Sequence, residues 1–188
     1  MASVVGICNR ALSRLGDKRI LSLTEDSKPA RACNSAWEPT RDEVLREHPW
    51  NCIVERASLA ALATAPDFGF DNQYQLPVDC ERVLEVIDLP PTWPWVVEGR
   101  KILCDLGAPL DIRYIKRETD PNQYDSLLRS VLAARMAVEL AEEITQSKSK
   151  RELEEARYAV ILSQAKAVDG QEQSPQDFEE DTWILARL

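Results

Sequence analysis

The chain has little of the chemistry on which most enzymes depend. Its 188 residues include one histidine, His48, and no C-x-x-C, G-x-G-x-x-G, G-x-x-x-x-G-K-[ST] or H-E-x-x-H motif. Any catalytic scheme that pairs histidine with serine or cysteine would have to use this one residue. Nucleotide and zinc sites of the common kinds have no matching pattern either. We expect no catalytic, cofactor-binding or metal-binding residues, and we predict that the protein is not an enzyme.

Cysteines are too few and too irregularly spaced for a structural framework. Their number is odd, and no two of them have the spacing of a zinc site or a redox motif. We interpret them as reduced side chains in the core of a cytosolic protein. The five positions are Cys8, Cys33, Cys52, Cys80 and Cys104.

Long apolar runs are also absent. No stretch approaches the roughly 18 apolar residues of a membrane span, and the N-terminus lacks the pattern of a signal peptide, so we expect a soluble protein without membrane contact. The net charge of −9 opposes the counterion release that drives tight binding to nucleic acid. Such a surface would still let DNA slide past without holding it.

Helical periodicity is present at both ends of the chain. Residues 3–15 and 27–48 carry apolar side chains at three- and four-residue steps, and Ser27 and Pro29 suit the start of the second helix. Pro39 lies inside that helix and predicts a kink or a break, because proline removes a backbone hydrogen bond.

Residues 120–169 predict two further helices that form an antiparallel hairpin. Asp120 and Pro121 suit the start of the first of these helices, whose wide apolar stripe indicates contact with neighbours on two sides. Polar residues 146–149 form the turn, and Gly170 ends the second helix. The side chains of that helix expected to face inward are Leu153, Ala156, Val160, Ile161, Ala165 and Val168.

Between residues 50 and 117 the pattern changes to short segments separated by proline and glycine. Residues 50–63 fit either a helix or a strand. The remaining pattern predicts strands at 83–87, 95–97, 102–104 and 111–116, the middle two forming a hairpin.

The combined prediction is an α+β fold. Residues 1–49 and 118–170 form a body of about four helices, and residues 50–117 form a small antiparallel β-domain inserted between helices two and three. Residues 171–188 are predicted to be an extended tail, too polar for a core of its own, that docks on a partner. Its candidate docking residues are Phe178, Trp183, Ile184, Leu185, Arg187 and Leu188.

Residues 41–51 read RDEVLREHPWN and resemble the RD-x-x-L-R-x-H-P-W-N signature of the tail tubular protein A family, the adaptor ring of short-tailed phages. Cys52 stands where the family pattern has an aromatic residue. Similar elements follow in the family order: PDFG at 66–69, YQLPVDCERVL at 74–84, EG at 98–99, AEEITQS at 141–147 and WILAR at 183–187. Within the signature, the residues predicted to form the corner between the second helix and the β-domain are Arg41, Asp42, His48, Pro49 and Trp50.

The resemblance implies a structural protein of the virion tail that is assembled in the host cytoplasm. Such proteins form a homo-oligomeric, dodecameric ring between the phage portal protein and a tail nozzle of the tail tubular protein B type. DNA passes through the lumen without specific binding. The resemblance further implies that residues 171–188 dock on the portal, and that the β-domain faces the nozzle, near the attachment of the tail fibres.

Two other functions remain open from the sequence. A head-closure or neck adaptor of another phage type would share the helical body but would need no inserted β-domain of this size. A tail-associated hydrolase would need paired carboxylates, and adjacent pairs such as Glu142 and Glu143 point about 100° apart on a helix, as on an ordinary solvated face.

Overall fold

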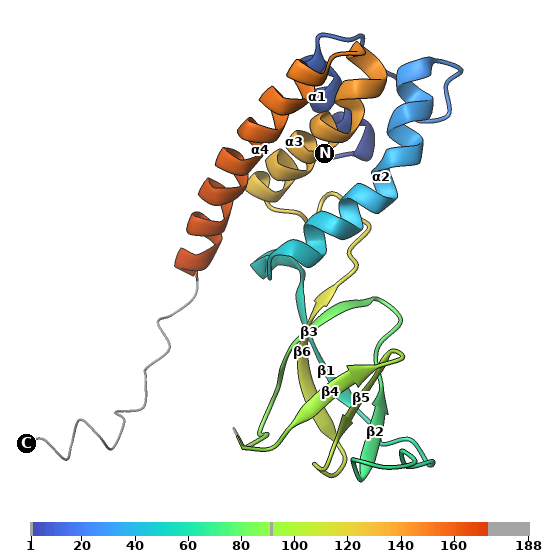
Figure 1. Ribbon diagram of the computed structural model, residues 1–188, viewed down its shortest axis with the longest axis vertical. Helices are drawn as coiled ribbons and strands as arrows, with labels where there is room; N and C mark the ends of the chain where they lie inside the picture. The colour runs from blue at the N-terminus through green and yellow to red at the C-terminus, as the bar shows by residue number, and fades with distance from the viewer. Residues whose placement is uncertain (1, 91, 173–188) are drawn as a thin grey trace, which may run out of the picture.

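The computed structural model describes residues 2–90 and 92–172. A helical body lies at one end of the molecule and a β-domain at the other, and the chain passes between them at the end of the second helix and before the third (Figure 1). The α+β fold predicted from the sequence is therefore confirmed.

The described residues contain four α-helices, of which α3 is the central one because it packs against each of the other three. Buried alanines on α3, such as Ala133 and Ala137, allow these neighbours to approach closely. The helices are α1 (Val4–Leu15), α2 (Lys28–Glu47), α3 (Ser126–Thr145) and α4 (Lys148–Asp169).

The ends of the first two helices follow the sequence signals. The Ser3 and Ser27 hydroxyls accept hydrogen bonds from the first free backbone N–H groups of α1 and α2. Gly16 follows α1 with φ of 80°, a left-handed conformation that glycine adopts without strain.

Of the kink or break predicted at Pro39, the structure excludes the break. Helix α2 continues through Pro39 and keeps buried residues on both sides of it, including Trp37 and Val44. Figure 1 shows the helix changing direction partway along its length, consistent with the predicted kink. Packing of both halves outweighs the one backbone hydrogen bond that proline removes.

The predicted start of the third helix is also wrong. Helix α3 begins at Ser126, and Asp125 provides the N-cap by accepting from the N–H groups of Leu127 and Leu128. The Asp120 carboxylate instead accepts from the backbone N–H of Asn122 at 3.0 Å, which stabilises a turn. Asp120 and Asp125 are both suitable N-cap residues, and the local sequence pattern does not show which of them caps the helix.

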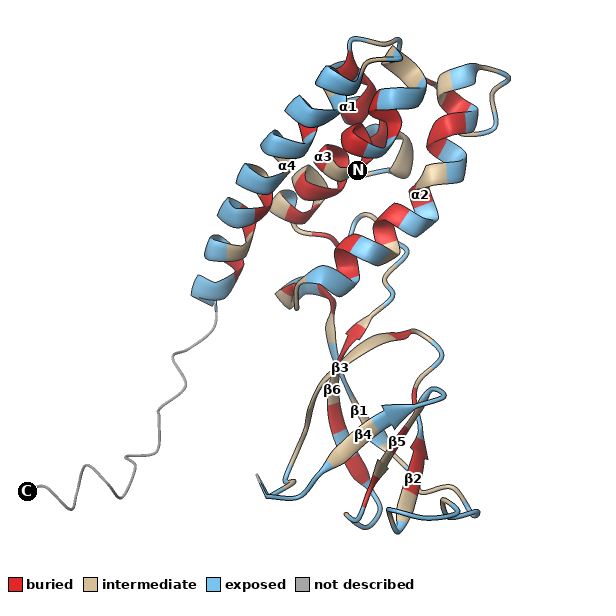
Figure 2. Cartoon of the chain, viewed as in Figure 1, coloured by how far each residue is buried: buried red, intermediate tan, exposed pale blue. Residues whose placement is uncertain are grey.

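The predicted inward face of α4 is largely wrong. Leu153, Val160 and Val168 are 45%, 57% and 45% exposed, and Ala156 is also exposed. Of the predicted set, Ala165 is buried and Ile161 is half-buried. The face that packs against the body carries the buried Glu154, Leu162, Ala165 and Asp169. Figure 2 shows α4 with a buried side toward the helical body and an exposed side facing away from it. The exposed side carries the apolar Leu153, Val160 and Val168.

The β-domain contains two three-stranded antiparallel sheets, with orders β1-β6-β3 and β2-β5-β4. Strand β2 was not predicted, because its sequence, NQYQ, is polar. The ambiguous stretch begins with a short 3-10 helix, Asn51–Ile53, and continues as β1. The strands are β1 (Val54–Leu59), β2 (Asn72–Gln75), β3 (Cys80–Val86), β4 (Trp95–Glu98), β5 (Lys101–Cys104) and β6 (Leu110–Lys116).

The two sheets enclose a core separate from that of the helical body. Tyr74 and Ile102 from one sheet pack with Leu110 and Ile112 from the other, and all four are almost fully buried. Ile115, near the end of β6, belongs instead to the core of the helical body. The two cores therefore meet at the ends of β1 and β6.

Candidate functional site

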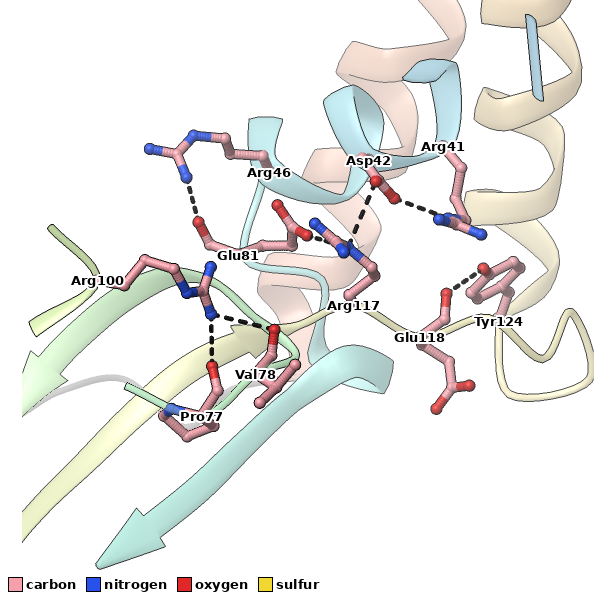
Figure 3. A network of polar contacts seen from close by, with 10 residues as sticks. All are labelled: Arg41, Asp42, Arg46, Pro77, Val78, Glu81, Arg100, Arg117, Glu118 and Tyr124. Carbon is pink, nitrogen blue, oxygen red and sulfur yellow. Dashed lines mark hydrogen bonds and ion pairs between the residues drawn. The ribbon is translucent and has the colours of Figure 1, made fainter. Parts of the chain in front are cut away.

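Arg117 joins three segments at the boundary between the helical body and the β-domain (Figure 3). It lies just after β6, and its Nε atom is 3.4 Å from an Asp42 carboxylate oxygen on α2. It also forms an ion pair with Glu81 on β3. The hydrogen bond to Glu81 and the charges of both acids raise the pKa of Arg117. We call Asp42, Glu81 and Arg117 the Arg117 network.

At the same boundary, arginines of α2 and of β3 each donate a hydrogen bond to a backbone carbonyl of the other element. Arg46 on α2 donates to the Glu81 carbonyl, and Arg82 on β3 donates to the Arg46 carbonyl at 3.2 Å. Arg41 is buried beside this network and donates to the Asp42 carboxylate at 2.8 Å. These bonds hold α2 and β3 in a defined arrangement.

Trp50 occupies the corner at which α2 turns into the β-domain. Its side chain is fully buried, and its indole N–H donates to the Val44 carbonyl at 3.0 Å. Its ring lies edge-on to His48, with centroids 4.7 Å apart. Pro49, which lies between these two residues in the sequence, is half-buried. The corner is thus packed and satisfied in its hydrogen bonding.

Asp169, the last residue of α4, is bound to this corner. The His48 Nε2 atom lies 2.8 Å from one Asp169 carboxylate oxygen, and the other oxygen accepts from the Asn51 backbone N–H at 3.0 Å. The Asn51 side-chain amide donates to the Asp169 carbonyl at 2.7 Å. We call these three residues the Asp169 cluster. It ties the end of α4, and so the start of the C-terminal segment, to the corner.

The structure divides the five predicted corner residues between two groups. Arg41 and Asp42 join the Arg117 network, whereas His48 and Trp50 form the corner next to Asp169. Pro49 joins the two ring-bearing residues. The six predicted docking residues lie outside the described residues: Phe178, Trp183, Ile184, Leu185, Arg187 and Leu188.

Sequence reasoning missed the partners of these residues. Asn51 stood inside the RDEVLREHPWN motif but had no role assigned, and Asp169 looked like an ordinary end of a helix. Likewise, no local sequence pattern indicated that Glu81 and Arg117 form an ion pair. Because their partners lie tens of residues away in the chain, only the fold brings them together.

A groove between α1 and α4 forms a second candidate site. It has a volume of about 530 Å³, and its walls are mostly apolar. Beneath it the Glu154 carboxylate is fully buried, 2.7 Å from Arg157 and 3.9 Å from Arg14. We call this the α1–α4 groove, and it is lined by Arg14, Leu153, Ala156, Arg157, Val160 and Ile161.

Among the described residues, the His48 ring nitrogen Nε2 is hydrogen-bonded to a carboxylate, that of Asp169, and not to a serine or cysteine side chain. Cys52, predicted to be in the core, is exposed and lies in sequence next to the Asp169 cluster. Desolvation raises the pKa of its thiol, and the charges of Asp125 and Asp169 raise it further. A catalytic thiol needs the opposite shift. The geometry around His48 therefore fits the orientation of chain segments rather than covalent chemistry.

Comparisons with known proteins add no assignment. A scan against protein-family models gave no match, and a search of curated proteins found no significant relative. Over residues 2–90 and 92–172, no three histidine, cysteine or acidic side chains gather where they could hold a metal ion. None of the helices in this part of the chain combines the length and apolar character needed to cross a membrane.

Proposed function

We propose that the chain is a portal-to-nozzle adaptor of a short-tailed phage, a structural protein that acts as a ring in the virion tail. The main support is the location of the family-like motif. Its residues His48, Trp50 and Asn51 lie at the point where the helical body, the β-domain and the end of α4 meet. An adaptor needs such a junction, because it must keep fixed the relative positions of surfaces that contact different partners.

The α4 helix supports assembly of identical copies. Its outer apolar face, with Leu153, Val160 and Val168, is left exposed by the other residues that the structure describes. Because these side chains are already about half buried, covering the rest contributes about 1 kcal/mol each. A head-to-tail contact of this kind closes into a ring when the rotation between copies is suitable, and repetition strengthens it.

The remaining surfaces fit the other proposed contacts. The β-domain carries exposed apolar side chains in its loops, Phe68 and Val78 at 88% and 91% exposure, which we propose for the nozzle side. Residues 171–188 would dock on the portal. The net charge of −9 suits a lumen through which DNA passes without being held.

The test uses the portal protein of the phage that encodes the chain. We expect Trp183→Ala to weaken binding to the portal by at least tenfold, because a buried tryptophan often dominates an interface. Thr182→Ala, next to it, is the matched control and should change binding less than twofold. Equal binding by both variants would remove the docking role from Trp183.

Electron microscopy of the purified protein with its portal tests the ring itself. We expect an annular layer below the portal with the helical bodies side by side and the β-domains on the side away from the portal. A single chain bound without neighbours, or no layer at all, would contradict the proposal. The head-closure alternative is less well supported, because the structure contains the inserted β-domain.

A further inference from the structure

The α1–α4 groove combines an apolar floor with an excess of positive charge. Burial lowers the pKa of Arg14, and the nearby charges of Arg10 and Arg157 lower it further, while Glu154 raises it. Arg14 and Arg157 line this groove, and Arg10 and Arg14 line a neighbouring hollow on α1. Glu154 is the buried acid that pairs with Arg14 and Arg157. An acidic ligand would reduce the repulsion that remains.

The floor of this groove needs an apolar ligand. Leu153 and Val160 are 45% and 57% exposed, and Ala156 lies between them on the same side of α4. An occupant that fits must therefore carry large apolar side chains next to carboxylates. Such a segment is present in the same chain: residues 177–185 read DFEEDTWIL.

We infer that residues 173–188 dock in the α1–α4 groove of their own chain when the protein is free. Phe178 and Trp183 supply apolar side chains, and four acidic residues between positions 177 and 181 face the arginines. In a protein of net charge −9, a groove bordered by arginines is an unusual surface to which this acidic segment is complementary.

The segment is long enough to reach the groove without help from another copy. A helix rises about 1.5 Å per residue and a 3-10 helix about 2 Å, so Val160 lies about 20 Å along the helix axis from Glu172, the last described residue. Residues 173–183 span up to about 36 Å when extended. Trp183 can therefore turn back and reach the level of Val160 on the same molecule.

Docking of residues 173–188 would also control the contact between copies. This control rests on the proposed function, although the docking itself does not. The outer face of α4 is also the surface that we propose for contact between copies. Docked residues 173–188 would cover it in the free chain, and binding of these residues to the portal would uncover it. Ring closure would then follow portal binding.

Disulfide trapping in the full chain tests the docking. The variant carries Val160→Cys and Thr182→Cys in a Cys52→Ser background, which leaves Phe178 and Trp183 intact. Ala159→Cys replaces Val160→Cys in the control, because a step of one residue turns its side chain by about 100°, toward a different side of α4. Positions 159 and 160 are almost equally far along the chain from residue 182, so the two disulfides differ in side-chain direction rather than in tether length.

We expect the disulfide within one molecule to form at least ten times faster with Val160→Cys than with Ala159→Cys, measured on non-reducing gels at low protein concentration. Adding Glu179→Lys and Glu180→Lys should remove most of this difference. Equal rates would overturn the inference. A product that joins two molecules would also overturn it and would assign the groove to a neighbouring copy.

Binding to the portal is measured separately on the reduced variants. Equal trapping rates for Val160→Cys and Ala159→Cys in the chain with its native acidic residues, together with intact portal binding, would contradict the groove inference alone. The Trp183→Ala comparison with the portal, in turn, tests the proposed function without any reference to the groove.

Discussion

At the scale of single residues, Asp169 links parts of the chain that are far apart in sequence. Its carboxylate is almost fully buried and accepts from Asn51, while its other oxygen lies 2.8 Å from His48 Nε2. A buried carboxylate is stable only when such partners are present. His48 therefore has a structural explanation that needs no catalytic role.

Asp169→Ala should lower the free energy of unfolding by about 1–3 kcal/mol, because it leaves buried hydrogen-bond donors without a partner. Glu155→Ala is the control, since Glu155 lies on the exposed part of the same helix. Denaturant unfolding measures both. Equal effects of the two substitutions would show that the Asp169 cluster contributes little.

Trp50→Phe should also lower the free energy of unfolding, by about 1–3 kcal/mol, because the Val44 carbonyl loses the indole N–H and a small void remains. Trp93→Phe is the matched substitution at a tryptophan that is 44% exposed, where we expect a change within about 0.5 kcal/mol. Thermal or denaturant unfolding distinguishes them, and similar losses at both sites would be inconsistent with the packed corner.

At the scale of the element, α4 shows how an amphipathic pattern can mislead. Leu153, Ala156 and Val160 recur at helical spacing and look like a core stripe. The structure instead turns Glu154 and Leu162 toward the body. Ion pairs from Arg14, Lys150 and Arg157 make burial of Glu154 tolerable. The local sequence pattern does not reveal these ion pairs. They accompany the difference between the face of α4 that is buried and the face that the sequence pattern predicts to be buried.

The orientation of α4 predicts unequal effects of two similar truncations. Leu162→Ala should cost about 2–4 kcal/mol of unfolding free energy, because Leu162 is only 9% exposed. Val160→Ala, at a side chain that is 57% exposed, should cost less than about 1 kcal/mol. Chemical denaturation of both variants measures the difference. A larger loss at Val160 would mean that the helix is rotated as the sequence pattern predicted.

At the scale of the whole molecule, two cores are joined through Ile115 on β6 and through a set of polar contacts. Tyr74 and Ile102 belong to the core of the β-domain, and Leu128 and Leu132 belong to that of the helical body. Between them lie the Arg117 network and the exchange of hydrogen bonds between Arg46 and β3. Such a boundary should hold the helical body and the β-domain in a fixed relative orientation while allowing them to differ in stability.

Ile102→Ala should therefore destabilise the β-domain selectively, by about 2–4 kcal/mol. Hydrogen exchange measured by mass spectrometry should accelerate in β2, β4 and β5 more than in α3. Leu132→Ala, at an equally buried position in the helical body, is the reciprocal variant. The same acceleration throughout the chain for both variants would show that the two parts unfold as one unit.

Local sequence signals predicted those parts of the fold in which the deciding interactions are local. Ser3, Gly16 and Ser27 act on the residues next to them, so the ends of α1 and the start of α2 were predictable. The hairpin of β4 and β5 follows from the turn at residues 99–100. Strand β2 was missed because its polar residues gave no local pattern.

By itself the sequence determined the α+β class, the insertion of the β-domain and the motif at the corner. Only the tertiary structure decided which face of α4 is uncovered and which residues hold the corner together. The physical reason is distance along the chain. Caps and turns act over a few residues, whereas the partners of Asp169, Glu154 and Arg117 are brought near by packing of the whole molecule.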